Sequence, residues 1–129
     1  MITMPNSLTT PSPSEGTTSP AGFVTGALIG HLTRVQLQGV LEQMSMGLST
    51  EEQRPVLLDC SCMDGYDLDA RHAFVEWNKQ WREHISRVGI VTDNRVYHLV
   101  ISAMSLASGQ SMKGFGELSE AEAWLRESD

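Results

Sequence analysis

Apolar residues in this chain alternate between short continuous runs and longer segments with helical spacing, beginning at Phe23. Short apolar runs are typical of buried strands, whereas repeats at intervals of three and four residues are typical of amphipathic helices. The pattern predicts four strands, over residues 23–32, 55–60, 86–92 and 111–115. A helical segment follows each of them, and strands joined by helices are most simply parallel. We therefore expect an α/β fold with a mostly parallel sheet of four to five strands and crossover helices.

Capping residues and helical spacing place the four expected helices. Thr33 is expected to cap the first, and Asp93-Asn94 the third, which Gly109 ends. The fourth is expected to begin at Ser119, where Ser-x-x-Glu has the spacing of a capping box.

The second and third helices have the clearest apolar faces. Inward positions of the second are Ala70, Ala73, Phe74, Trp77 and Trp81, and its polar side carries Arg71, Glu76, Lys79 and Arg82. Inward positions expected for the third are Val96, Leu99, Val100, Ala103, Met104 and Ala107.

The chain is expected to divide into a flexible tail, residues 1–22, and one domain, residues 23–129. The stretch from Met4 to Gly22 is rich in Ser, Thr and Pro and nearly free of large apolar side chains. It cannot bury enough surface to offset the entropy of ordering. The remainder is long enough to enclose a single apolar core.

Net charge restricts the partners of this domain. The chain has 129 residues, with 9 Lys and Arg against 16 Asp and Glu, a formal net charge of −7 and a pI of about 5.0. Such a charge repels phosphate backbones and anionic lipid surfaces, so we expect no nucleic-acid partner.

No apolar run reaches the roughly 18 to 20 residues that span a bilayer, and the N-terminus lacks the pattern of a secretion signal. We therefore expect no membrane insertion and a cytoplasmic location.

An acidic stretch follows the most apolar strand, with the sequence LLDCSCMDGYDLD from Leu57 to Asp69. Its carboxylates could bind Mg²⁺ or Ca²⁺, but the spacing lacks the Asp-x-Asp-x-Asp-Gly pattern of a calcium loop. The interpretation that needs no ligand is a turn at Gly65, a helix cap at Asp67 or Asp69, and loop amides bound by Asp59.

The sequence lacks the common patterns of catalytic and cofactor sites. Cys60 and Cys62 lie one residue apart on or just after a strand, where they cannot easily meet disulfide geometry, so we expect reduced thiols. There is no second cysteine pair and no Cys-x-x-Cys, so we expect neither a zinc nor a redox site. The four histidines share no ligand spacing, and there is no Gly-x-Ser-x-Gly or Gly-x-Gly-x-x-Gly motif. A phospho-receiver domain would need a pair of acids after its first strand, where this chain has His31-Leu32-Thr33. We expect no enzymatic activity, metal or cofactor.

Four segments carry motifs of a known family: Gly30–Thr33, Val56–Ser61, Val88–Asp93 and Phe115–Leu125. They include Leu-Asp-x-Ser at a strand end and a final helix of the form Leu-x-Glu-Ala-x-Ala-Trp-Leu. With the order of elements, these motifs resemble the STAS domains (sulfate transporter and anti-sigma factor antagonist), and within them the SpoIIAA-like subgroup. The resemblance implies a non-catalytic domain that binds another protein in signalling.

The resemblance also marks one position of the acidic stretch. In phosphorylatable members of the family, an Asp-Ser-Ser-Gly motif opens the helix after the Leu-Asp-x-Ser strand, and a partner kinase phosphorylates its second serine. That motif falls on Asp67-Leu68-Asp69-Ala70, so Asp69 stands at the phosphoserine position. A carboxylate there supplies one permanent negative charge where a phosphate would supply about two.

Two functions follow as hypotheses. In the first, Asp64, Tyr66, Asp67, Leu68 and Asp69 form a docking face for a protein partner, such as an anti-sigma-type kinase or another signalling protein. In the second, the domain binds a small apolar or anionic ligand between sheet and helices, because parallel sheets bind ligands outside the carboxyl ends of their strands. Those ends are expected near Asp59, Thr92-Asp93 and Phe115.

Overall fold

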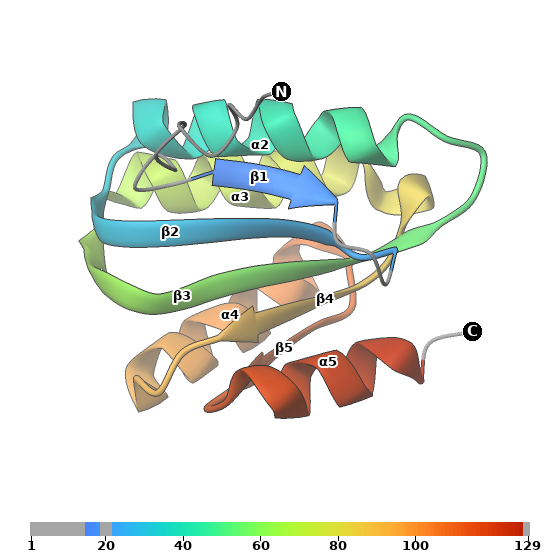
Figure 1. Ribbon diagram of the computed structural model, residues 1–129. Coiled ribbons are helices and arrows are strands. Elements are labelled where there is room, and N and C mark those ends of the chain that lie inside the picture. Colours follow the sequence, from blue (N-terminus) through green and yellow to red (C-terminus); the bar gives the residue numbers. More distant parts are fainter. Residues whose placement is uncertain (1–14, 19–21, 128–129) are drawn as a thin grey trace, which may run out of the picture.

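The apolar runs of the sequence form a five-stranded sheet in the computed structural model, which describes residues 15–18 and 22–127 (Figure 1). Its strands are β1 (Glu15–Thr18), β2 (Val24–Leu32), β3 (Arg54–Tyr66), β4 (Ile85–Val91) and β5 (Met112–Phe115). They lie in this order across the sheet. Strands β2 to β5 are parallel, and β1 pairs antiparallel with β2. The predicted α/β class with a mostly parallel sheet is confirmed.

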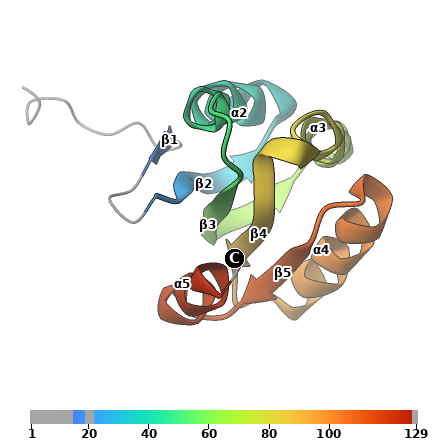
Figure 2. The ribbon, with the colours of Figure 1, turned by 90° about the vertical axis from the view of Figure 1, so that its right-hand side faces the viewer.

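The helices connect these strands as the periodicity predicts. They are α2 (Arg34–Leu48), α3 (Leu68–Gln80), α4 (Arg95–Ser108) and α5 (Leu118–Arg126), with one 3₁₀ turn, η1 (Arg82–His84), before β4. The sheet has different helices on its two faces: α2, α3 and α4 cover one face, and α5 packs on the other (Figure 2). Each apolar face of the sheet is thereby removed from water.

Local capping interactions explain where α2 and α4 begin and where α4 ends. Thr33 and Gln36 form a reciprocal capping box at the start of α2. The Asn94 side chain accepts hydrogen bonds from the backbone N–H groups of Val96 and Tyr97 at the start of α4. Gly109 ends α4 in the left-handed conformation with a φ of 73°.

The predicted capping box at Ser119 is wrong. Helix α5 begins one residue earlier, and its cap position is occupied by Glu117, whose side chain makes no capping hydrogen bond. Ser119 therefore already lies inside the first turn.

Four residues of the predicted tail belong to the sheet. Glu15–Thr18 pairs with residues 24–27 of β2, and residues 1–14 and 19–21 of that tail lie outside the described residues. The outer edge of β2 offers unpaired backbone groups, and two β-branched threonines favour an extended partner. A strand of four residues forms here through its backbone pairing with β2.

The larger core lies between the sheet and α2, α3 and α4. It is built on fully buried side chains of the two central strands and α2, among them Val24, Val56, Leu58, Leu37 and Met44. A smaller core under α5 consists of Phe23, Leu57, Val91, Ala121 and Leu125. Alternate residues of β3 enter the two cores, which the continuous apolar run Val56–Leu58 predicts for a strand covered on both faces.

Helix α4 buries less of its surface than its sequence predicts. Ile101, Met104 and Ser108 are buried, but Val96 and Leu99 are exposed, as are Ala103 and Ala107. The helix lies near the β5 edge of the sheet, where only its inner side has a partner (Figure 2).

Strand β3 extends six residues beyond its predicted carboxyl end, to Tyr66, and this extension places the candidate site. Residues 62–66, which the sequence assigned to a loop, pair with Ile29–Leu32 of β2 across two register shifts, the second at Gly30, where φ is 74°. Strand β4, by contrast, makes its last pair with β3 at Asp59 and Val91. Beyond that pair β3 continues beside β2 alone (Figure 1). The edge of β3 that faces β4 is thus left open at its carboxyl end.

Candidate functional site

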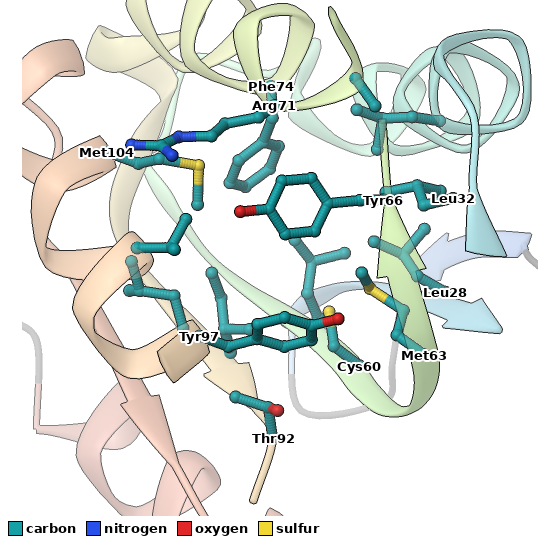
Figure 3. A pocket seen from close by; sticks show the side chains of 16 residues that line it. Leu28, Leu32, Cys60, Met63, Tyr66, Arg71, Phe74, Thr92, Tyr97 and Met104 are labelled. Atoms are coloured by element: carbon teal, nitrogen blue, oxygen red, sulfur yellow. The ribbon is translucent and has the colours of Figure 1, made fainter. Parts of the chain in front are cut away.

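An apolar pocket occupies the space where β3 and β4 separate (Figure 3). Its volume is about 70 Å³. It is lined by sixteen residues, which come from β2, β3, β4, the three helices on this face and Thr92, the residue after β4. The buried part of the wall is formed by Leu28, Leu32, Leu37, Leu58, Cys60, Ala70, Phe74, Ile90, Thr92, Ile101 and Met104. Met63, Tyr66, Arg71, Tyr97 and Val100 are half-buried and form the rim.

Two tyrosines join β3 to α4 at this rim. The rings of Tyr66 and Tyr97 meet edge to face, with centroids 5.7 Å apart and an interplanar angle of 60°. This is a favourable geometry for two aromatic quadrupoles. Burial raises the pKa of Tyr97 above its ordinary value, and Tyr66 and the Asp64 carboxylate add to the effect. The Tyr97 ring therefore presents a neutral hydroxyl group at neutral pH.

The floor of the pocket contains two small polar side chains that are already satisfied or neutral. Burial raises the pKa of the Cys60 thiol from 9.0 to about 12, and the adjacent Asp59 carboxylate adds to the shift. The thiol is therefore protonated at neutral pH. The Thr92 hydroxyl accepts a hydrogen bond from the Asn94 backbone N–H, and the Thr92 carbonyl lies 2.8 Å from Nε2 of His98. The interior is thus effectively apolar.

Arg71 is the one charged residue among the sixteen. The sequence placed it on the polar, outward side of α3, and that placement is wrong. It lies in the first turn of α3, next to Ala70, where the end of β3 turns into the helix. Because this turn covers the open end of the sheet, the side chain reaches the pocket rim beside Phe74 and Met104 (Figure 3).

The residues predicted to form a docking face lie directly beside the pocket. Asp64, Asp67, Leu68 and Asp69 are exposed, and we call these four residues the acidic corner. The predicted loop is a single residue, Asp67, because β3 continues to Tyr66 and α3 begins at Leu68. Tyr66 differs from the other predicted residues, since its ring is half-buried and lines the pocket.

Hydrogen bonds fix the aspartates of this region in distinct ways. Asp67 occupies the cap position of α3 but makes no capping bond with its side chain. Its Oδ1 instead lies 2.7 Å from Nε2 of His31, which ties the end of β2 to the start of α3. Asp59 Oδ1 accepts from the Ser61 backbone N–H and hydroxyl, at 3.0 and 2.6 Å. Asp59 therefore binds a neighbouring amide, as the sequence predicts, although within a strand and not in a loop.

Over residues 15–18 and 22–127, no group of three or more His, Cys, Asp and Glu side chains is arranged to hold a metal ion. Cys60 is buried and Cys62 exposed, and both are free thiols. None of the helices in this part of the chain is long and apolar enough to cross a membrane. The chemistry available at the site is binding of an apolar group, with one guanidinium and two phenol groups at the rim.

Sequence reasoning located the carboxyl edge of the sheet but only part of the pocket. Of the residues named for a small ligand, Thr92 lines the pocket, whereas Asp59, Asp93 and Phe115 do not. Tyr97 and Arg71 were missed in this role. Each lies in the first turn of a helix that follows a strand of the parallel sheet, and this position is the sequence signal that could have found them.

The family model described as SpoIIAA-like matches residues 23–126. A search among curated proteins found no match. Among solved structures, an uncharacterized protein of the DUF3478 family from Shewanella loihica PV-4, described as having a SpoIIAA-like fold, is similar with a TM-score of 0.70. The two chains share 16% identity, and the match covers 87% of this chain and 91% of that one. At this identity, the similarity concerns the fold.

Proposed function

Because this chain belongs to the SpoIIAA-like family and has an apolar pocket at the carboxyl edge of its sheet, we propose that it is a non-catalytic binding domain for a small apolar ligand. The pocket is the observation that carries the proposal. It lies where open parallel sheets characteristically bind ligands, outside the carboxyl ends of the strands. A concave, mostly apolar site with a few polar groups at its rim is also the usual form of a small-molecule site.

Physical chemistry favours an organic occupant over water. A buried water needs two to four polar partners, and apolar cavities remain dry and accept apolar molecules. The interior here is formed by aliphatic, aromatic and sulfur-containing side chains, with the Thr92 hydroxyl already bonded. A volume of about 70 Å³ is less than half of the about 150 Å³ that admits benzene in an engineered cavity. The buried part of the ligand is therefore a short hydrocarbon group.

The test is thermal unfolding with neutral n-alcohols from butanol to octanol. A ligand at about 100 times its Kd stabilises the folded state by about 2.7 kcal/mol, which raises the Tm of a domain of this size by about 10 °C. We expect such a rise for the wild-type protein. Val100→Trp, which fills the rim, should abolish it, and Leu99→Trp, on the exposed side of α4, should retain it. Absence of any shift, or equal shifts in both variants, would refute the pocket as a ligand site.

The acidic corner supports a second function, docking of a protein partner in signalling. Asp69 lies exposed in the first turn of α3. The sequence resemblance implies that it stands at the phosphoserine position of related domains. Leu68 beside it is 61% exposed and offers apolar contact area. A negative charge at a helix N-terminus next to an exposed leucine has the mixed character of a recognition surface. An anti-sigma-type kinase or another cytoplasmic signalling protein is the partner we propose.

This docking is tested by affinity capture from the cells that make the protein. Asp69→Lys should lose a specific partner that the wild-type chain retains, because it reverses one of the charges of the acidic corner. Glu42→Lys makes the same change in charge on the exposed side of α2 and should retain that partner. Equal capture by the wild type and both variants would exclude the acidic corner as the docking face.

A further inference from the structure

Arg71 lies at the rim of the apolar pocket and has no counter-ion among the residues that the structure describes. Over the residues that the structure describes, the contacts between basic and acidic side chains are His31–Asp67 and Lys79–Glu76, and neither includes Arg71. The acid one helical turn before it is Asp67, at the spacing where a pair would form on a helix surface. Asp67 is directed to His31 instead, at 2.7 Å. The Arg71 guanidinium is therefore available to pair with another anion.

The surroundings of Arg71 make this arrangement costly unless an acceptor is present. A guanidinium carries five N–H donors and no acceptor, and it remains charged at all relevant pH values. Here it is half-buried among the side chains of the pocket rim, next to Phe74 and Met104 (Figure 3). Partial burial of a charge without a partner is unfavourable. A carboxylate is the acceptor whose geometry matches the guanidinium, through two parallel N–H···O bonds.

A second polar group faces the same part of the pocket. In Figure 3 the hydroxyl of Tyr66 points toward the side where the Arg71 guanidinium and Met104 lie, whereas the Tyr97 hydroxyl points toward Met63. The Tyr66 hydroxyl can donate to an anionic oxygen bound by Arg71. Asp64 adds to the raised pKa of Tyr97, so its carboxylate acts on the Tyr97 part of the rim. An anionic group is therefore favoured at Arg71 and disfavoured at Tyr97.

We propose that the ligand of this pocket is a small apolar acid whose carboxylate pairs with Arg71 and Tyr66 while its hydrocarbon group fills the interior. The inference rests on the proposed ligand-binding function and adds the chemical class of the ligand. A chain with a net charge of −7 can bind an anionic ligand at this point. The attraction of a guanidinium in direct contact with the ligand outweighs the repulsion from screened charges farther away.

The experiment compares acids with alcohols of equal chain length by calorimetric titration at pH 7. The probes are butanoate, hexanoate and octanoate against butanol, hexanol and octanol. In the wild-type protein we expect the acid to bind with a Kd about 10- to 100-fold lower than that of the matching alcohol, because hydrogen bonds to charged groups are stronger. In Arg71→Gln this preference should disappear, with alcohol affinity changed by less than about 3-fold. Arg71→Lys keeps the charge without the bidentate geometry and should fall between the two.

Arg34→Gln is the matched control, because it removes an exposed arginine from the first turn of α2. It should leave the affinities for both kinds of probe as in the wild type. Equal wild-type affinities for acid and alcohol would overturn the ligand class and leave the pocket as a neutral-ligand site. Equal weakening of both by Arg71→Gln would overturn it as well, since Arg71 would then only support the fold. Failure of every probe to bind would refute the proposed ligand-binding function itself.

Discussion

Replacement of Leu58 by alanine is expected to lower the free energy of unfolding by about 3–5 kcal/mol, at the upper end for Leu→Ala changes in protein cores. Leu58 lies in the central strand β3 and is 1% exposed. Its side chain also lines the pocket. The lost methyl groups would enlarge a space that already exists, and the cost of such a change grows with the volume left empty. Domains of this kind have total stabilities of only about 5–15 kcal/mol.

Urea unfolding followed by circular dichroism measures this effect, and Leu99→Ala is its control. Leu99 is 73% exposed on α4, so the same chemical change there should alter stability by less than about 0.5 kcal/mol. Similar losses for the two variants would contradict the assignment of Leu58 to the core. They would also contradict the outward orientation of Leu99.

The two cysteines are expected to differ by about 1,000-fold or more in reaction with a thiol reagent at pH 8. The thiolate is the reactive form, and a pKa of about 12 in place of 9.0 reduces its fraction by three powers of ten. Burial of Cys60 adds a barrier to access, whereas Cys62 is exposed. The folded protein should therefore incorporate one label per chain rapidly, and the unfolded protein two.

Labelling of Cys62→Ser isolates Cys60 as the single thiol. In this variant, we expect almost no reaction in the folded state below pH 9 and rapid reaction in denaturant. The raised pKa also has a sign for stability: the unfolded thiol ionises above about pH 9 and the folded one only near pH 12. The free energy of unfolding should therefore decrease as the pH rises from about 9 to about 12. Rapid modification of folded Cys62→Ser would show that Cys60 is accessible and that the pocket floor is open.

The pocket and the acidic corner share one structural origin, the end of β3. Strand β4 stops pairing at Val91, while β3 continues along β2 to Tyr66. The open side of this extension forms the pocket wall, and the turn that follows presents Leu68 and Asp69 to solvent. Tyr66 belongs to the pocket and directly precedes the turn. A ligand in the pocket and a partner at the acidic corner would thus both contact the few residues that start α3.

Local sequence patterns are sufficient to predict the elements of this fold and their order. Continuous apolar runs such as Val56–Leu58 can be satisfied only in a strand covered on both faces, and helical spacing after Ala70 leaves one apolar stripe to bury. Caps at Thr33 and Asn94 act through neighbouring amides, so local sequence is sufficient to place them. The parallel arrangement followed because helices separate the strands.

The length of β3, the exposure of α4 and the composition of the site depend on how distant segments pack together. Residues 61–66 look like a loop by composition, and they are extended because β2 offers them backbone partners. Val96 and Leu99 look like core residues, and they are exposed because the sheet ends beneath α4. Arg71 has the periodicity of a solvated position, yet it faces a pocket that exists only where two strands diverge. These features depend on contacts between distant segments, and no local pattern encodes them.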